Sequence, residues 1–571
     1  MNKKTNKQAS QLLYEADEKL NNDWINKNAT FHKFSKGKGI VILDDSVTKI
    51  GFEAFRECQS LTSIVIPDSV SEIGGWAFMN CHSLVSVVIP NSVTQIKACA
   101  FDGCKNLMSI NLPDSVTEIE MGAFEDCTAL REPLYNAKCF AYFPNGFATE
   151  YRIPDGIKQI AGYAFKDCKT LTSIVIPDSV TQIDFRAFVG CSALESVIIP
   201  DSVTEIENRV FEDCTALREP LYNALCFAYF PNGSATEYRI PDGIKQIAGY
   251  AFKDCKSLNS IIIPDSVTEI GDSAFSGCAS LTSMIIPSSV KRIEDDTFRG
   301  CSSLKSVSIP DSVTHIGKWA FSGCSALESV FIPDSVTHIG RWAFKGCFAL
   351  TEPVYNANCF AYLPRRYASE YKIPDGIEQI ASYAFEDCQC LSSIILPDSM
   401  TEIYDAAFSG CISLSHIVIP DGVTKIGTLA FNECESLTSI IIPDSVKVIG
   451  GAAFVGCTAL TSIVIPDSVT EIESETFIDC IALTSMIIPD SVTQIGDCAF
   501  YGCKNLKYII IPDSVYRIGE GAFADCSALK YIIIPDSLIA IGDEAFRNCD
   551  DLPDDVREKI LDINEEAFDN L

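Results

Sequence analysis

The sequence repeats itself every 23 residues over most of its length. The proline of an I-P-D-S-V motif marks the period, recurring at Pro67, Pro90 and Pro113 and then on to Pro535. Asp44 takes the same slot in a degenerate first copy, which makes 20 units, and an 18-residue insertion stretches three of them to 41 residues. Units of a repeat array pack only on their neighbours, so the chain should form one growing body rather than several globular domains.

Each unit follows the pattern L-x-x-I-x-I-P-x-S-V-x-x-I-G-x-x-A-F-x-x-C, as in residues 61–81. The L-x-x-I-x-I stretch has the β-branched residues of a strand, and the proline ends it because it cannot donate to a ladder. The S-V-x-x-I stretch suits a second short strand, and A-F-x-x-C suits one helical or 3₁₀ turn. Such a unit cannot bury its own apolar residues, but stacked coils about 4.8 Å apart bury them continuously. The pattern therefore predicts an α/β solenoid.

The repeat resembles a known family across residues 40–549. L-x-x-I-x-I is similar to the strand signature of leucine-rich repeats, and the continuation I-P-x-S-V-x-x-I-G-x-x-A-F-x-x-C resembles the BspA-like class. The resemblance implies a right-handed superhelix with a parallel sheet on its concave side. It also implies kinship with surface antigens and adhesins that bind proteins of a host or of other cells.

The middle residue of I-x-I should point away from the core if both isoleucines point inward, and here it is mostly β-branched. A row of such side chains would form an apolar patch larger than the few hundred Å² usual on a monomer. One interpretation is a surface that binds a protein partner or a second copy of the chain. The alternative is that the facing is reversed, or that β-propensity alone explains the residues. We call this row the stripe; Asn111 and Ser308 break it, and its members are Val65, Val88, Val175, Ile198, Ile262, Ile285, Phe331, Ile395, Val418, Ile441, Val464, Ile487, Ile510 and Ile533.

The three insertions are near-copies of one another and predict a β-hairpin each. In the first, "PLY" is followed by a turn at Asn136 and Ala137 and by "CFAYF", which Pro144 ends. Their aromatic side chains form either an exposed platform for a partner or a layer packed on the solenoid edge. These candidate residues are Tyr135, Phe140, Tyr142, Tyr222, Phe227, Tyr229, Tyr355, Phe360 and Tyr362.

Twenty of the 26 cysteines close an A-F-x-x-C segment, where a small buried residue fits best. The sequence contains no C-x-x-C pair that would indicate a zinc site. His315 and His338 lie one unit apart, and the sequence indicates no third ligand beside them. We expect neither a metal nor another cofactor. The more reactive thiols should be those outside the slot, which are Cys99, Cys139, Cys226, Cys359, Cys390 and Cys498.

No catalytic motif occurs in a fitting context, and the Asp-Ser pairs belong to turns that recur in nearly every unit. We therefore expect a protein that is not an enzyme. Asp and Glu (76) outnumber Lys and Arg (44), a formal charge of −32, which disfavours nucleic acid and anionic membrane surfaces.

The chain also lacks an apolar run long enough for a secretory signal or a membrane span. On the sequence we expect a cytoplasmic protein with reduced cysteines. The alternatives are a truncated gene start, or a cell-surface or secreted protein exported without the usual signal.

Both ends are expected to cap the open core of the array. Residues 8–24 show helical apolar spacing at Leu12, Leu13, Ala16 and Leu20, and residues 554–571 begin with acidic residues that favour a helix start. We thus expect a helical cap over residues 1–35, the solenoid over 36–549, and a second helical cap over 550–571. The function expected is non-enzymatic protein binding: adhesion as the resemblance implies or, as the alternative, intracellular scaffolding.

Overall fold

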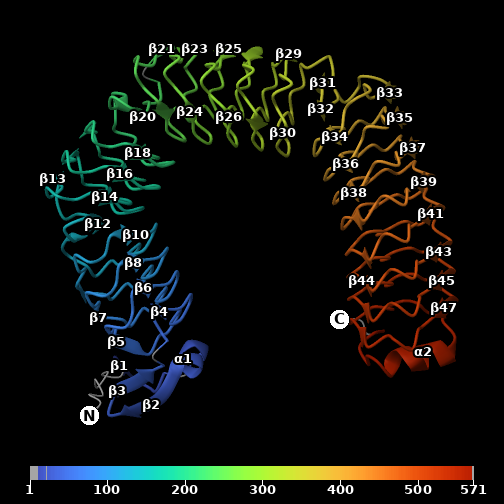
Figure 1. The fold of residues 1–571 in the computed structure, drawn as a ribbon, viewed down its shortest axis with the longest axis horizontal. Coiled ribbons are helices and arrows are strands. Elements are labelled where there is room, and N and C mark those ends of the chain that lie inside the picture. The colour runs from blue at the N-terminus through green and yellow to red at the C-terminus, as the bar shows by residue number, and fades with distance from the viewer. Residues whose placement is uncertain (1–10, 21, 45, 234, 569–571) are drawn as a thin grey trace, which may run out of the picture. The chain divides into compact units, whose positions relative to one another are not determined.

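The structure is a computed structural model that describes residues 11–20, 22–44, 46–233 and 235–568. It forms the solenoid that the 23-residue period predicts (Figure 1). The chain divides into two compact units, residues 1–276 (unit 1) and 277–571 (unit 2). In each unit, turns of ribbon stack side by side and contribute strands to two walls of the solenoid. Each wall consists of several short, mostly parallel sheets, and we call the two walls the first sheet and the second sheet.

The first sheet is made by the L-x-x-I-x-I segments. Equivalent residues of successive turns lie side by side, as Ser63, Ile64 and Val65 do with Ser86, Val87 and Val88. In unit 1 its strands are β5 (Leu61–Val65), β7 (Ser86–Val88), β9 (Ser109–Ile110), β13 (Glu150–Arg152), β15 (Ser173–Val175), β17 (Ser196–Ile198), β21 (Glu237–Arg239) and β23 (Ser260–Ile262). In unit 2 they are β25 (Ser283–Ile285), β27 (Ser306–Ser308), β29 (Ser329–Val330), β33 (Glu370–Lys372), β35 (Ser393–Ile395), β37 (His416–Val418), β39 (Ser439–Ile441), β41 (Ser462–Val464), β43 (Ser485–Ile487), β45 (Tyr508–Ile510) and β47 (Tyr531–Ile533).

The second sheet is made by the last two residues of each S-V-x-x-I segment. Its strands in unit 1 are β4 (Lys49–Ile50), β6 (Glu72–Ile73), β8 (Gln95–Ile96), β10 (Glu118–Ile119), β14 (Gln159–Ile160), β16 (Gln182–Ile183), β18 (Glu205–Ile206), β22 (Gln246–Ile247) and β24 (Glu269–Ile270). In unit 2 they are β26 (Arg292–Ile293), β28 (His315–Ile316), β30 (His338–Ile339), β34 (Gln379–Ile380), β36 (Glu402–Ile403), β38 (Lys425–Ile426), β40 (Val448–Ile449), β42 (Glu471–Ile472), β44 (Gln494–Ile495), β46 (Arg517–Ile518) and β48 (Ala540–Ile541). The isoleucine of each strand points into the core, and the residue before it is more exposed in nearly every strand.

The A-F-x-x-C segment is not a helical turn, so that expectation is wrong. The residue just before each segment and the fourth residue within it have a positive φ, as Trp76 (56°) and Asn80 (58°) do, which a right-handed helix does not allow. The segment forms tight turns that bond to the next coil, as the Phe55 N–H does to the Ala77 carbonyl at 2.7 Å. Among the described residues, helices occur only near the two ends of the chain.

The phenylalanine of each A-F-x-x-C segment is buried and stacks on its copies in neighbouring turns. In unit 2 the rings of Phe408, Phe431 and Phe454 are nearly parallel, with centroids 5.4 and 5.5 Å apart. The closing cysteine is buried beside this column, and its thiol donates to the phenylalanine carbonyl of the preceding turn, as Cys81 does to Phe55 at 2.9 Å. The slot therefore needs a small residue that both packs and satisfies a carbonyl.

The insertions form the predicted hairpins: β11 (Leu134–Tyr135) with β12 (Cys139–Tyr142), β19 (Leu221–Tyr222) with β20 (Cys226–Tyr229), and β31 (Val354–Tyr355) with β32 (Cys359–Tyr362). The second strand of each hairpin pairs in parallel with the second sheet, as β12 does with β14. The insertion is thus part of the solenoid wall and does not project from it.

A buried asparagine fixes each hairpin to the turn before it. The Asn136 side chain donates to the carbonyls of Pro113 and Val116, both at 2.9 Å, and accepts from the Lys138 and Cys139 N–H groups. Asn223 and Asn356 make the corresponding contacts. A polar side chain is buried here because it satisfies four backbone groups that would otherwise lack partners.

The N-terminal cap is mostly β-structure, so the expected helical cap over residues 1–35 is wrong. The described residues form β1 (Gln11–Ala16), α1 (Asp23–Asn28), β2 (Ala29–Ser35) and β3 (Lys38–Leu43); residues 8–10 and 21 of the expected helix lie outside them. Leu12, Tyr14 and Ala16 are buried and alternate with exposed residues, which is strand periodicity. β1 pairs antiparallel with β5 and so covers the first turn of the solenoid.

The C-terminal cap contains the expected helix, α2 (Asp554–Leu561), which begins with two acidic residues. Ile560 is its buried residue, while Leu561 is 41% exposed. Residues 569–571 of this cap lie outside the described part of the chain.

Candidate functional site

The stripe lies on the outer face of the first sheet, as predicted. In each three-residue strand the middle residue points into the core, so its two neighbours point outward. In β39, for example, Ile440 is 3% exposed and Ile441 is 73% exposed. The facing assigned from the sequence is therefore confirmed, and the reversed facing is wrong.

Every stripe residue is exposed except Ile510, which is half-buried. Polar and charged residues interrupt the row at five stripe positions, which are Asn111, Arg152, Arg239, Ser308 and Lys372. Arg152, Arg239 and Lys372 follow the three insertions, and each forms an ion pair with the aspartate three residues on. The insertions thus divide the stripe into separate stretches.

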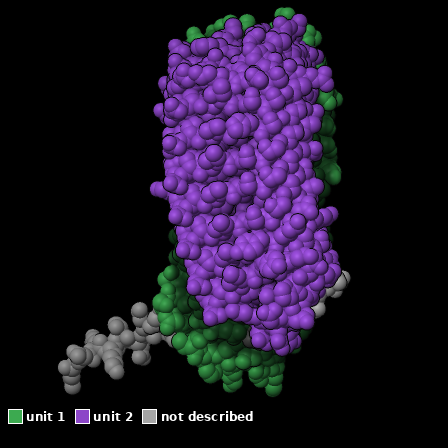
Figure 2. Space-filling view, turned by 90° about the vertical axis from the view of Figure 1, so that its right-hand side faces the viewer, with its two compact units in different colours: residues 1–276 green, residues 277–571 purple. Residues whose placement is uncertain are grey.

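The longest unbroken stretch lies in unit 2, on strands β35 to β47, and we call it the C-terminal stripe. Paired strands place its members side by side, as Ile395 beside Val418 and Ile441 beside Val464. With strands about 4.8 Å apart, the row is roughly 29 Å long. Figure 2 shows this side of unit 2 as parallel rows that follow successive turns. Its members are Ile395, Val418, Ile441, Val464, Ile487, Ile510 and Ile533.

The two sides of the C-terminal stripe differ in chemistry. On one side, the outward residue at the start of each strand is Ser393, His416, Ser439, Ser462, Ser485, Tyr508 or Tyr531. On the other side, an exposed aspartate follows each stripe residue three positions later. Of these, Asp536 pairs with Lys559 at 2.7 Å, and the other six form no ion pair with any described residue. We call this row the aspartate ladder: Asp398, Asp421, Asp444, Asp467, Asp490, Asp513 and Asp536.

The comparison with family models matches the family described as "BspA type Leucine rich repeat region (6 copies)". The matches cover residues 25–139, 135–225, 223–351, 355–484 and 470–571, which together span nearly the whole chain. The chain belongs to this BspA-type leucine-rich repeat family. The family model names no catalytic activity.

No curated protein matches this BspA-type chain. Among solved structures, it is similar to a leucine-rich cell surface protein from Faecalibacterium prausnitzii A2-165, with 29% identity over 69% of this chain and 89% of that one, at a TM-score of 0.33. A leucine-rich repeat protein from Bacteroides ovatus ATCC 8483 is 21% identical over 95% of this chain and 97% of that one, at a TM-score of 0.24. The T. pallidum leucine-rich repeat protein is 26% identical over 36% and 87%, at a TM-score of 0.28.

The insertion aromatics of this BspA-type solenoid do not form one exposed platform. Phe140, Phe227 and Phe360 are fully buried in the core, so their candidacy as partner-binding residues is wrong. Tyr362 is 9% exposed, and Tyr142 and Tyr229 are half-buried in the same strands. The outward residues are Tyr135, Tyr222 and Tyr355, each 42–44% exposed and stacked on the buried phenylalanine of its own hairpin.

The cysteines, all of which lie in the described residues, form no disulfide. Three thiols expected to be reactive are buried in the hairpins, where burial raises the pKa of Cys139 and Cys359 to about 12 and that of Cys226 to about 11. A thiol with so high a pKa is a poor nucleophile at neutral pH, so that expectation is wrong for them. Cys390 is exposed, and Cys99 and Cys498 are half-buried.

His315 and His338 lie on the adjacent strands β28 and β30, with ring centroids 5.9 Å apart. Within the described part of the chain, no group of three or more His, Cys, Asp or Glu is arranged to hold a metal ion. Neither of the two described helices has the length and apolar character needed to cross a bilayer.

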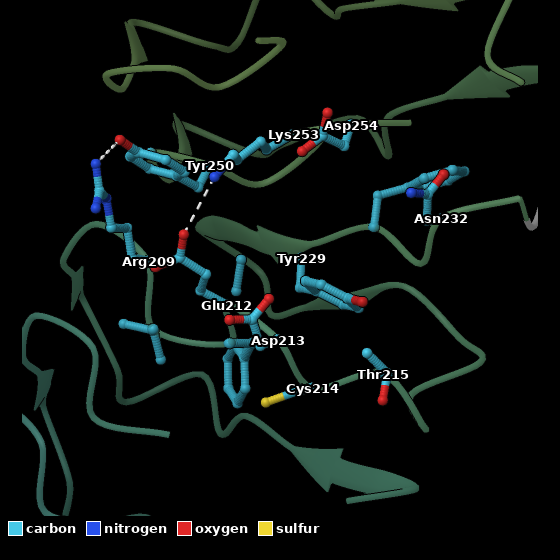
Figure 3. A pocket seen from close by; sticks show the side chains of 15 residues that line it. Arg209, Glu212, Asp213, Cys214, Thr215, Tyr229, Asn232, Tyr250, Lys253 and Asp254 are labelled. Atoms are coloured by element: carbon cyan, nitrogen blue, oxygen red, sulfur yellow. Dashed lines mark hydrogen bonds and ion pairs between the residues drawn. The ribbon is translucent and has the colours of Figure 1, made fainter. Parts of the chain in front are cut away.

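A cavity of about 200 Å³ lies beside the second insertion in unit 1 (Figure 3). The hairpin lacks an A-F-x-x-C segment of its own, so the segments of the flanking turns face each other across the gap. Glu212 forms ion pairs with Lys253 at 3.2 Å and with Arg186 at 2.9 Å. The Arg209 guanidinium lies 4.0 Å from the centre of the Tyr250 ring and donates to its hydroxyl. The side chains named here pair with one another across the cavity. The cavity therefore lies where two solenoid turns meet beside the hairpin.

Proposed function

We propose that this protein binds another protein, without catalysis, through the C-terminal stripe. The observation that carries the proposal is an unbroken row of seven β-branched side chains, six of them 57–73% exposed, on two adjoining parallel sheets, β33–β41 and β43–β47. An exposed apolar row of this length is uncommon on a monomer and is typical of an interaction surface. A rigid sheet also loses little conformational entropy when a partner packs on it.

The aspartate ladder indicates the chemistry of the partner. A partner that lies along the stripe would present apolar side chains to Ile441 and its neighbours and basic side chains to the aspartates. The formal charge of −32 adds a general attraction for a basic protein. It also opposes stacking of two copies stripe to stripe, so a different, basic partner is favoured over self-association.

The stripe is tested by replacing Ile441, Val464 and Ile487 together with serine. Since these side chains are 71–73% exposed, the thermal unfolding transition should change little, while binding should be lost. The measurement is a selection of phage-displayed random peptides on the wild-type protein, counter-selected on the triple variant. Peptides retained only by the wild type should be rich in apolar residues and in lysine or arginine.

The matched control replaces Ser439, Ser462 and Ser485 with alanine, because these outward residues lie on the same strands beside the stripe. This control should select the same peptides as the wild type. If no peptide is retained by the wild type alone, or if the thermal transition of the triple serine variant collapses, the proposal fails. Concentration-dependent dimerisation that the triple variant abolishes would instead assign the stripe to self-association.

Within this function we propose adhesion at a cell surface, which the family resemblance implies, and keep an intracellular scaffold as the second candidate. Treating intact source cells with a protease, followed by detection with an antibody to this chain, separates the two. For an adhesin, the signal should disappear from intact cells. Protection in intact cells, with cleavage after lysis, would refute surface adhesion and support the scaffold.

A further inference from the structure

The third insertion differs from the other two at several positions, and four of these, Thr351, Arg365, Arg366 and Tyr367, line one pocket. The first two copies read Pro-Asn-Gly after the hairpin, and the third reads Pro364-Arg365-Arg366, followed by Tyr367. The residue after the preceding slot cysteine also changes, from threonine in the first two copies (Thr128 and Thr215) to Phe348.

These substitutions surround a pocket of about 600 Å³ in unit 2. Its buried wall contains Leu350 and Tyr362, which are 4% and 9% exposed. Its rim is aromatic and basic: the Phe348 ring is 68% exposed and Tyr367 is 39% exposed, beside the two arginines. A pocket of this volume falls within the range of ligand sites, and an exposed phenylalanine at its mouth gives a ligand apolar surface to cover.

The turn at the rim holds the arginines in place. The Tyr367 N–H donates to the Pro364 carbonyl at 2.9 Å, which closes the turn. In the first two copies the third residue of this turn is a glycine with φ of +81°, a conformation that a side chain rarely adopts. Arg366 is not among the described residues with positive φ, so the third copy uses a turn that accepts the arginine without strain.

The two arginines have different surroundings. Arg365 pairs with Asp387 at 2.8 Å, and its guanidinium lies 5.8 Å from the centre of the Phe348 ring, so it is held along the rim. The Tyr367 hydroxyl donates to Glu352 at 3.3 Å. Arg366 is exposed, and no hydrogen bond or ion pair joins its side chain to a described residue. Its planar guanidinium is free to bind a carboxylate through two parallel hydrogen bonds.

We propose that this pocket binds the part of a peptide in which a carboxylate lies next to an aromatic or large apolar side chain. The side chain enters the pocket against Phe348 and Leu350, and the carboxylate binds Arg366. The site is separate from the C-terminal stripe and has the opposite charge preference, since the aspartate ladder favours basic partners. The carboxylate is either the end of a peptide chain or an acidic side chain.

Isothermal titration calorimetry on the full chain tests the site with small probes. N-acetylphenylalanine presents a terminal carboxylate, and N-acetyl-Glu-Phe-amide presents a side-chain carboxylate beside the same ring. We expect at least one to bind, and N-acetylphenylalaninamide, which lacks a carboxylate, to bind at least about tenfold more weakly. Whichever acid binds more tightly identifies the source of the carboxylate.

The variants Phe348→Thr and Arg366→Gly restore residues that the first two copies already carry, so both should fold. Each should weaken binding of the acidic probe about tenfold or more. Arg239→Gln, which changes an exposed arginine outside the pocket, should leave that binding unchanged. The proposal is wrong if neither acid binds, if the amide binds as tightly as the acids, or if Arg366→Gly binds like the wild type.

Discussion

Replacing Phe431 with alanine is expected to lower the free energy of unfolding by about 3–5 kcal/mol. Its ring is fully buried and stacks between Phe408 and Phe454, so the substitution leaves a cavity lined by two other rings. Backbone bonds to the turns on both sides, such as that from the Phe431 N–H to the Ala453 carbonyl, keep the cavity from collapsing. Urea unfolding followed by circular dichroism measures the effect.

Phe331→Ala is the matched control, because the same substitution is made in unit 2 on a stripe residue that is 73% exposed. It should change the free energy of unfolding by less than about 0.5 kcal/mol. Equal effects of the two substitutions would mean that the phenylalanine column does not stabilise the solenoid. A repeat array can also unfold in parts, so a broadened transition for Phe431→Ala is consistent with the prediction.

The solenoid and the facing of the stripe could be predicted because each rests on a pattern repeated along the chain. Twenty copies of one motif leave little choice of where the isoleucines point, and the strand period of two then places residues such as Ile441 outside. The tight turns of A-F-x-x-C could not be predicted in this way. Residues such as Trp76 take a positive φ because bonds to neighbouring turns fix the backbone, and its type does not signal that conformation.

The N-terminal cap was mispredicted because its sequence fits two periods. Leu12, Leu13 and Ala16 suit one face of a helix, while Leu12, Tyr14 and Ala16 suit one face of a strand. Pairing decides between them: β1 lies between β3 and β5, and neither partner is indicated by the local sequence. Long-range backbone pairing overrides a weak local preference.

The insertions were predicted as hairpins but not as parts of the second sheet. The turn at Asn136 indicates the hairpin, but the partner of its second strand depends on the space between two solenoid turns. For the same reason the sequence does not decide which aromatic residues of the insertion are buried. In the structure Phe140 takes the place of a core residue of the wall, whereas Tyr135 faces outward. The sequence alone does not show that Phe348 and Arg366 line one pocket beside the third insertion, because they are 18 positions apart in the chain.

Asp184 is a buried acid that the repeat pattern does not require. In the unit that follows the second insertion, the same slot holds Gly271. The Asp184 side chain accepts a hydrogen bond from Gln159 at 2.6 Å through one oxygen, while its other oxygen is buried without a partner. Burial is the main cause that raises the pKa of this carboxyl to about 7, and the nearby Glu207 adds to it.

Replacing Asp184 with asparagine is therefore expected to stabilise the protein, and more so at high pH. Between an unfolded-state pKa of about 3.9 and the folded pKa of about 7, the folded chain holds a proton that the unfolded chain has released. Stability contributed by this group is thus present in full below about pH 4 and lost as the pH rises to about 7. Asparagine keeps an oxygen for Gln159 and carries no charge, so it avoids this loss.

At pH 8 the gain in the free energy of unfolding should be on the order of 2–4 kcal/mol, falling towards zero near pH 4, as measured by urea unfolding across that range. Asp178→Asn is the control, because Asp178 lies in the same unit on an exposed turn and should change stability little at any pH. A gain for Asp184→Asn that does not depend on pH would show that the benefit comes from packing and not from removal of a buried charge. A loss of stability at pH 8 would mean that the ionised carboxylate is stabilised where it lies, and the burial argument would then be wrong.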